Sequence, residues 1–172
     1  MPNHMDTLIS KGKGKFKAMQ ARLDGVAGVF KTLTEQHGEV EALLTRVKHD
    51  PDKRQDLWPK IRTELRSHER AEVQEVYPAL RDRGQEPLCS LADQHDAEAR
   101  ELEQLIRRLD LIEITSDAWG RLFEQLVDTV VAHASEEETE IFPLAQSVLG
   151  EARARQLDKK FLAAKQRIAQ ST

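Results

Sequence analysis

The chain has 172 residues, of which 33% are charged and 39% hydrophobic, and a formal net charge of −4. This length suits one domain with its own apolar core, and the negative charge argues against a nucleic-acid partner. No apolar run approaches the ~20 residues that cross a bilayer, and no signal layout opens the chain. The single cysteine, Cys89, excludes an internal disulfide and a thiolate metal cluster. We therefore expect a cytoplasmic protein with no membrane partner.

The first predicted element is a long amphipathic helix. Apolar residues recur in steps of three and four from Phe16 to Val47, with His37 at a core position of this stripe. Pro51 ends the pattern, because the residue before a proline disfavours helical geometry. Gly25 and Gly28 would weaken the upstream part by roughly 1 kcal/mol each as interior positions. Residues 1–14 are predicted to be a flexible lead-in.

Further helices follow after short connections. The second begins near Asp56, with Pro59 in its first turn, and is capped by Gly84. The third spans 87–109, and the fourth begins after Ser116, a good N-cap residue, and ends at Gly150. Residues 15–150 are therefore predicted to form an all-α, up-down-up-down four-helix bundle, built from two helix hairpins. Residues 151–172 predict a C-terminal helix packed on its outside.

The two hairpins look like copies of one design. "LTEQHGEVEALL" (33–44) resembles "LADQHDAEARELEQL" (91–105), and both place Gln directly before His. Each copy continues with His, a Glu four residues later, and an aromatic residue followed by proline. The prolines, Pro78 and Pro143, lie inside predicted helices and should kink or loosen the last turns. An approximate twofold would place equivalent side chains face to face.

Four of the six histidines occupy positions where a core residue is expected, one on each helix, and two glutamates follow one turn later on the same face. These six candidate metal ligands are His37, His68, Glu72, His95, His133 and Glu137. Hydrogen-bonded core histidines are the alternative reading. Two facing carboxylates make that reading unfavourable, because burying an unpaired carboxylate costs several kcal/mol of free energy. A bound cation removes the cost, and the sequence therefore predicts a metal site.

The ligand set indicates which metal. Four imidazoles and two carboxylates are too many for one tetrahedral zinc and too rich in nitrogen for magnesium or calcium. Two irons, bridged by both carboxylates and an oxo or hydroxo group, with two histidines each, fit the number and softness of the ligands. The Glu-x-x-His motif of ferritin-like bundles and the His-Glu-x-x-His motif of zinc proteases are absent.

Between about residues 30 and 150 the chain resembles the hemerythrin-like proteins with the HHE cation-binding domain. Their pattern is His, His-x-x-x-Glu, His, His-x-x-x-Glu, and the six candidates match it when Glu69 is counted as a spacer. The resemblance implies a bundle around a non-haem di-iron centre that meets O2, NO or peroxide. Oxygen carriers of the family usually add a fifth histidine, where this chain has Ala99, and an Asp where it has Glu138. Glu138 stays an alternative ligand to Glu137.

Three smaller features allow two readings each. Glu75 and Glu140 lie seven residues after their histidines and are candidates for holding ligands or passing protons, although solvated carboxylates are the simpler reading. Tyr77, the single tyrosine, is a third candidate for tuning an iron. Phe142 holds the same place in the second copy, which favours a packing role.

The leading functional prediction is a di-iron protein that binds, and reduces or senses, a small oxidant: O2, NO or peroxide. Without the fifth histidine, both irons keep an open position, which suits reduction or sensing better than reversible oxygen carriage. The alternative is iron storage or donation, including repair of iron–sulfur clusters, with no turnover of a small molecule. The expected partners are accordingly the oxidant and an electron donor, or an iron–sulfur client protein.

Overall fold

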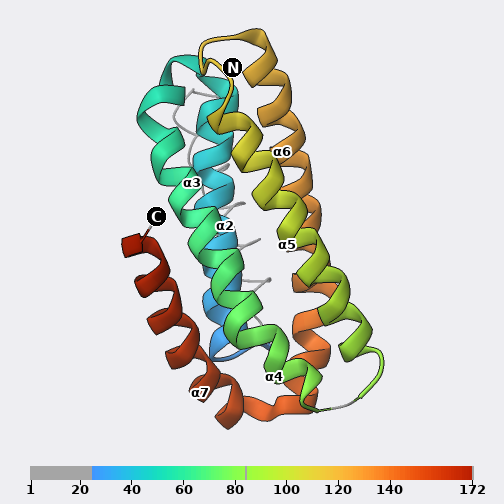
Figure 1. The fold of residues 1–172 in the computed structure, drawn as a ribbon. Helices are drawn as coiled ribbons and strands as arrows, with labels where there is room; N and C mark the ends of the chain where they lie inside the picture. Colours follow the sequence, from blue (N-terminus) through green and yellow to red (C-terminus); the bar gives the residue numbers. More distant parts are fainter. Residues whose placement is uncertain (1–24, 84, 172) are drawn as a thin grey trace, which may run out of the picture.

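The computed structural model describes residues 25–83 and 85–171, and within these ranges all regular structure is helical. The elements, in chain order, are α2 (Val29–His49), the 3-10 turn η1 (Pro51–Lys53), α3 (Arg54–Ala71), η2 (Glu72–Val76), α4 (Tyr77–Arg81), α5 (Leu88–Asp110), α6 (Asp117–Glu136), η3 (Glu137–Ile141) and α7 (Phe142–Ser171). The predicted all-α bundle is confirmed (Figure 1). None of the described helices is long and apolar enough to cross a membrane.

Short connections join four long rods that run up and down in turn: α2, then α3 with η2 and α4, then α5, then α6 with η3 and the start of α7 (Figure 1). The Ser116 hydroxyl accepts a hydrogen bond from the backbone N–H of Trp119 at 3.1 Å, which confirms the predicted N-cap of α6. The helix α3 begins at Arg54, two residues earlier than predicted, because η1 leads directly into it. Pro59 therefore lies beyond the first turn. Gly84 lies outside the described residues.

The predicted long first helix is wrong at residues 25–28, because the helix α2 begins only at Val29. Gly25 and Gly28 adopt positive φ angles of 88° and 57°, which belong to turns and not to a helix interior. A Cβ atom on Gly28 would lie 2.3 Å from the backbone carbon of Ala154, so only glycine allows α2 and α7 to approach this closely. The stripe residues from Phe16 to Leu23, and the lead-in 1–14, lie outside the described residues.

The predicted kinks before the two prolines take the form of π-helical segments. The N–H of Tyr77 bonds the carbonyl of Glu72, and the N–H of Phe142 bonds that of Glu137, a separation of five residues in both cases. Each segment accommodates one residue more than an α-helical turn holds. Both therefore turn the following side chains relative to an unbroken helix.

After Gly150, where φ is 76° and ψ is 162°, the chain reverses. The rest of α7 runs back along α2 and α3 and covers them on one side (Figure 1). Leu157, Phe161 and Ile168 are buried on its inner face, as their spacing predicts. The division of the chain at residue 150 into a bundle and a packed helix stays a prediction.

Candidate metal centre

The six candidate ligands lie between two separate apolar clusters. One cluster, near α4 and α7, contains Phe30, Ala71 and Ile141, whereas the other, near the opposite end of the bundle, contains Val40, Leu65 and further residues around two tryptophans. On each rod, a candidate histidine stands where the stripe passes from one cluster to the other. The six candidate ligands, His37, His68, Glu72, His95, His133 and Glu137, thus form one polar layer with their neighbouring side chains across the middle of the bundle.

The histidines of the first copy meet each other and both glutamates. Nε2 of His37 lies 3.2 Å from Nε2 of His68 and 3.3 Å from Oε2 of Glu137. Nε2 of His68 lies 3.2 Å from Oε2 of Glu72. Both rings therefore direct Nε2 toward a candidate glutamate, His37 toward Glu137 and His68 toward Glu72.

The second pair lies across from the first. The rings of His95 and His133 have centroids 4.6 Å apart, and a nitrogen of each lies 3.7 Å from Oε1 of Glu137. Because its other oxygen faces His37, Glu137 spans both pairs. Glu72 groups with His133 and Glu137 as well as with His68 and Glu69, which also places it between the pairs. The structure thus brings all six candidates together.

The two π-helical segments begin at the two candidate glutamates. Glu72 and Glu137 are the first residues of η2 and η3, and neither side chain is exposed to solvent. π-Helical insertions occur frequently at functional sites. In both copies the insertion changes the direction of the side chains after the glutamate, while the N–H of each glutamate keeps its α-helical bond to the carbonyl of its histidine.

The layer contains an unusual concentration of buried polar atoms without a hydrogen-bond partner. These are both carboxylate oxygens of Glu72, both ring nitrogens of His95, Nε2 of His133, Oε2 of Glu137 and Oε2 of Glu69. Buried polar atoms nearly always have a hydrogen-bond partner in proteins, and a bound ion is one of the few explanations for such exceptions. Carboxylate oxygens and imidazole nitrogens are also suitable donors for iron. The residues present therefore fit a metal centre.

Without a metal, protons reduce the charge of the layer. Burial alone would lower the pKa of His37, but hydrogen bonds and charge from Glu137 and Glu138 outweigh it and raise that pKa to about 9. Burial also opposes charge on His133, yet Glu69 and Glu137 raise its pKa well above the usual value. Burial raises the pKa of Glu72, helped by the neighbouring carboxylates. Cationic histidines and a protonated glutamate thus stand where a cation would otherwise balance the carboxylates.

The pKa values of two other residues of the layer are lowered. Burial is the largest influence on Glu137 and opposes its charge, but His133, His37 and His95 together lower its pKa far below the usual value. Burial and the charge of His37 lower the pKa of His68, which stays neutral. In the metal-free layer Glu137 is therefore a charged carboxylate between the two pairs, and His68 is a neutral imidazole.

The outer ring nitrogens have their own partners. Nδ1 of His37 lies 2.9 Å from Glu138, Nδ1 of His68 lies 3.0 Å from Gln36, and Nδ1 of His133 lies 2.8 Å from Glu98. The hydrogen bond to His133 lowers the pKa of Glu98 to about 2. Such contacts fix ring orientation in metal sites. Glu138 thus stands on the outer side of His37, whereas Glu137 stands on the inner side, which is the geometry expected if Glu137 is the ligand.

The other candidates have different surroundings. The Tyr77 hydroxyl donates a hydrogen bond to Oε1 of Glu137 at 2.9 Å, and burial raises the pKa of Tyr77, so the proton stays in place. Tyr77 therefore does more than the packing that comparison with Phe142 favours. Glu140 is exposed, and Glu75 faces a hollow lined by α7. A regular α-helix would have turned both toward the ligands, but the π-helical segments rotate them away.

Sequence reasoning missed Glu69 and Glu98. Glu69 is 7% exposed, and its Oε2 lies 3.3 Å from Nε2 of His133. Comparison of the two copies concealed it, because Ala134 occupies the corresponding position. Its place four residues after Leu65, on the buried face of α3, was the available signal. Glu98, one turn after His95, was likewise visible only as a charge on a helix.

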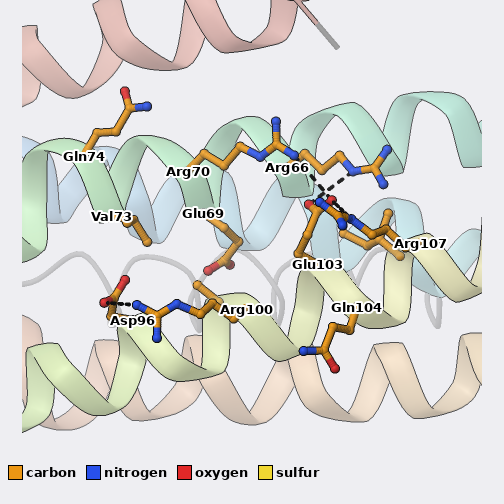
Figure 2. A pocket seen from close by; sticks show the side chains of 12 residues that line it. Arg66, Glu69, Arg70, Val73, Gln74, Asp96, Arg100, Glu103, Gln104 and Arg107 are labelled. Atoms are coloured by element: carbon orange, nitrogen blue, oxygen red, sulfur yellow. Dashed lines mark hydrogen bonds and ion pairs between the residues drawn. The ribbon is translucent and has the colours of Figure 1, made fainter.

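A cleft of about 430 Å³ opens between α3 and α5 beside the layer. Figure 2 shows Glu69 reaching from α3 toward α5 within it, with Arg66, Arg70 and Arg100 around it. Ala99, which replaces the fifth histidine of the family's oxygen carriers, also lines this cleft. A second cavity, of about 20 Å³, lies inside and shares Glu69 with the cleft.

Residues 28–145 match the family described as the hemerythrin HHE cation-binding domain. The chain belongs to this family. Cation binding is the property that the family's description names, and the buried cluster of His and Glu offers groups that could hold a metal ion. The helix α7 extends well beyond the matched residues.

A curated relative, named as a DNA nickase from Nostoc sp. (strain PCC 7120 / SAG 25.82 / UTEX 2576), is 28% identical over 137 residues. The aligned part covers 78% of this chain but 38% of that protein, so the chain spans well under half of the relative's length. No solved structure matches the chain.

Proposed function

We propose that this hemerythrin-family protein holds two iron ions and uses them to bind, and to reduce or sense, a small oxidant such as O2, NO or peroxide. His37 and His68 would serve one iron, His95 and His133 the other, and Glu72 and Glu137 both. The observation that carries the proposal is the set of buried donor atoms without hydrogen-bond partners, which belong to residues of both copies and meet in one layer.

Bound iron would supply open coordination positions and one-electron redox chemistry, which no side chain of the layer provides. The chain's own residues supply the surroundings. Glu137 is held as an anion by the histidines around it, and the Tyr77 hydroxyl fixes one of its oxygens. The two apolar clusters exclude water from both ends of the layer.

The inner cavity of about 20 Å³ fits a very small ligand. It lies beside His37, His68 and His133 and is walled by Val40, Leu65 and Val130. A cavity of roughly 10–15 Å³ or more holds one water molecule, so this one has room for a molecule with about two non-hydrogen atoms. Its apolar wall favours an uncharged ligand such as O2, NO or hydrogen peroxide.

The cleft between α3 and α5 is the proposed route of entry. Glu69 lines both the cleft and the inner cavity, and the small side chain of Ala99 leaves the passage open. Glu69 also lies close enough to His133 to join the donor set of the second iron. Movement of this one side chain would connect solvent with the layer.

The proposal is tested first by iron content per chain and the optical spectrum of the full-length protein, compared with His68→Ala. Wild type should contain two irons and show near-ultraviolet charge-transfer bands, and the variant should lose both. The loaded protein is then mixed with hydrogen peroxide or NO under stopped-flow conditions. A wild-type chain that folds fully in the presence of iron and binds none would contradict the metal centre.

An experiment with the same iron-loaded protein distinguishes the alternative function. Iron that passes readily to an apo iron–sulfur protein, with no turnover of peroxide or NO, would favour iron donation or cluster repair. We propose no action on DNA for this chain, although the relative is named as a DNA nickase. The chain has a net charge of −4, and the buried groups of the layer that lack hydrogen-bond partners are metal donors. The absence of a nucleic-acid partner stays a prediction.

A further inference from the structure

Lys165 connects the C-terminal helix to a candidate ligand. Its Nζ donates to Oε1 of Gln36 at 2.7 Å and to Oε2 of Glu64 at 2.8 Å, and its side chain is 15% exposed. The same Gln36 oxygen lies 3.0 Å from Nδ1 of His68. Lys165 lies twenty residues beyond the end of the family match, so this chain of contacts is an addition to the family domain.

The chemistry of these groups determines where the proton of His68 lies. A lysine ammonium group has only donors, so the Gln36 atom that faces it must be the amide oxygen and not the amide nitrogen. An oxygen that also lies beside Nδ1 of His68 can only accept, so Nδ1 must carry the hydrogen. In a neutral imidazole the other nitrogen, Nε2, then has the free lone pair. Nε2 is the nitrogen that faces Glu72 and His37.

We propose that Lys165 is a positioning residue that acts through Gln36 to hold His68 in the Nδ1–H tautomer, with Nε2 free for a metal. Phe161, one turn earlier on α7, meets the His68 ring edge-on with centroids 5.9 Å apart and restricts its rotation. The role in metal binding rests on the proposed function, whereas the choice of tautomer does not.

The second copy lacks this arrangement. Gln94, which corresponds to Gln36, donates to Glu98 and Glu136, and Nδ1 of His133 bonds the Glu98 carboxylate directly. A carboxylate accepts without ambiguity, so it needs no further group to orient it. A glutamine amide can turn either end toward its neighbour, and this is the ambiguity that Lys165 removes.

A purely structural role for Lys165 has a different signature. Its ion pair with Glu64, a side chain that is 35% exposed, could simply hold α7 on the bundle. Glu64→Gln breaks that ion pair and leaves the contact with Gln36, so it is the matched control. Lys165→Met removes both contacts and keeps the aliphatic stem, and Lys165→Arg restores a donor.

The test is a long-range ¹H–¹⁵N spectrum of the full-length, metal-free protein with labelled histidine, which reports the tautomer of each ring. We expect the Nδ1–H form of His68 in wild type, Glu64→Gln and Lys165→Arg, and a shift toward the Nε2–H form in Lys165→Met. Gln36→Met, which leaves the Lys165–Glu64 ion pair intact, should show the same shift. An unchanged His68 tautomer in both Lys165→Met and Gln36→Met would overturn the proposal.

Iron release then tests the consequence for the metal. Loss of a group that orients a metal-binding histidine typically costs 10- to 100-fold in metal affinity, so Lys165→Met should lose iron to a chelator at least about tenfold faster than Glu64→Gln. Equal rates in these two variants would refute the effect on the metal. If wild type binds no iron but the tautomer responds as expected, the proposed function fails and the positioning role of Lys165 stands.

Discussion

The two halves of the metal centre descend from similar sequences but have different surroundings. The His37–His68 pair is enclosed, since Phe142 stacks on His37 and Phe161 from α7 meets His68. The His95–His133 pair has the carboxylates of Glu69 and Glu98 close to it, and Glu69 lines the cleft between α3 and α5. Two rings of α7 thus pack on the first pair, whereas two additional carboxylates lie beside the second.

This difference shows what a repeat does and does not specify. The repeated residues place the ligand candidates, but their outer partners are not repeated: Glu138 of the second copy corresponds to Val73, and Glu69 of the first copy corresponds to Ala134. Two metals held by this layer would therefore experience different charge and different access to solvent. We expect a ligand that enters past Glu69 to reach the inner cavity beside His37, His68 and His133, so that it meets both halves.

The largest effect should follow from removing the group that both halves share. Glu137→Gln preserves the shape of the side chain but removes the charge that lies between His37 and the other pair. Removing one partner of a buried charge pair typically costs about 3–5 kcal/mol, so iron affinity should fall by roughly a thousandfold at both positions. Iron content per chain and the optical spectrum measure this loss.

Glu140→Gln is the matched control, because Glu140 lies in the same π-helical segment but is exposed. It should leave iron content and spectrum unchanged. Loss of iron from only one half in Glu137→Gln would show that this residue does not bridge.

A pH dependence of the metal-free protein should come next in size. The pKa of His37 rises from 6.5 to about 9 on folding, so the protonated ring stabilises the fold fully below pH 6.5 and this contribution disappears as pH rises through 9. A shift of this size corresponds to about 3 kcal/mol. His133, whose pKa is also raised, acts in the same direction.

Urea unfolding at pH 6 and at pH 9.5 measures this contribution. His37→Gln should show a smaller loss of stability between the two pH values, and iron-loaded wild type should lose less than metal-free wild type because the metal replaces these protons. A metal-free protein that is as stable at pH 9.5 as at pH 6 would be inconsistent with a charged His37.

The smallest effect should come from making the two copies alike. Tyr77→Phe gives the first copy the aromatic residue of the second and removes the hydrogen bond to Glu137 without changing the packed ring. Hydrogen bonds to charged groups contribute about 1.5–3 kcal/mol, and the lower end is expected here because histidines also hold Glu137. Denaturant unfolding of the metal-free protein checks the stability, and a shifted iron spectrum would accompany it.

The sequence was sufficient for the helices and for the six buried candidates, because apolar periodicity and a misplaced polar residue are both local signals. It was insufficient where one inserted residue changes which positions of a helix face the core. Leu144 and Val148 continue the predicted stripe, yet the structure leaves them partly buried and buries Ala145 and Leu149 instead, because η3 intervenes. A π-helical segment has no clear sequence signature apart from the proline that follows it.

Two other features needed three-dimensional information. The sequence predicts Gly28 as an interior position that only weakens the first helix, and the reason why the helix begins after it is the backbone of Ala154, which lies directly against it. In the sequence motif Glu69 is only a spacer, and the structure is needed to show that it lines the cleft and lies beside His133. Both depend on contacts between residues far apart in the chain, which periodicity does not report.

The close approach of Gly28 to Ala154 has a consequence for the unit that folds. A chain cut after Gly150 would keep every candidate ligand but would expose the inner faces of α2 and α3 and the ring of His68 to water. The residues that match the family, 28–145, therefore end before the part of α7 that covers α2 and α3. A side chain from outside the family match thus contributes to the burial of a candidate ligand.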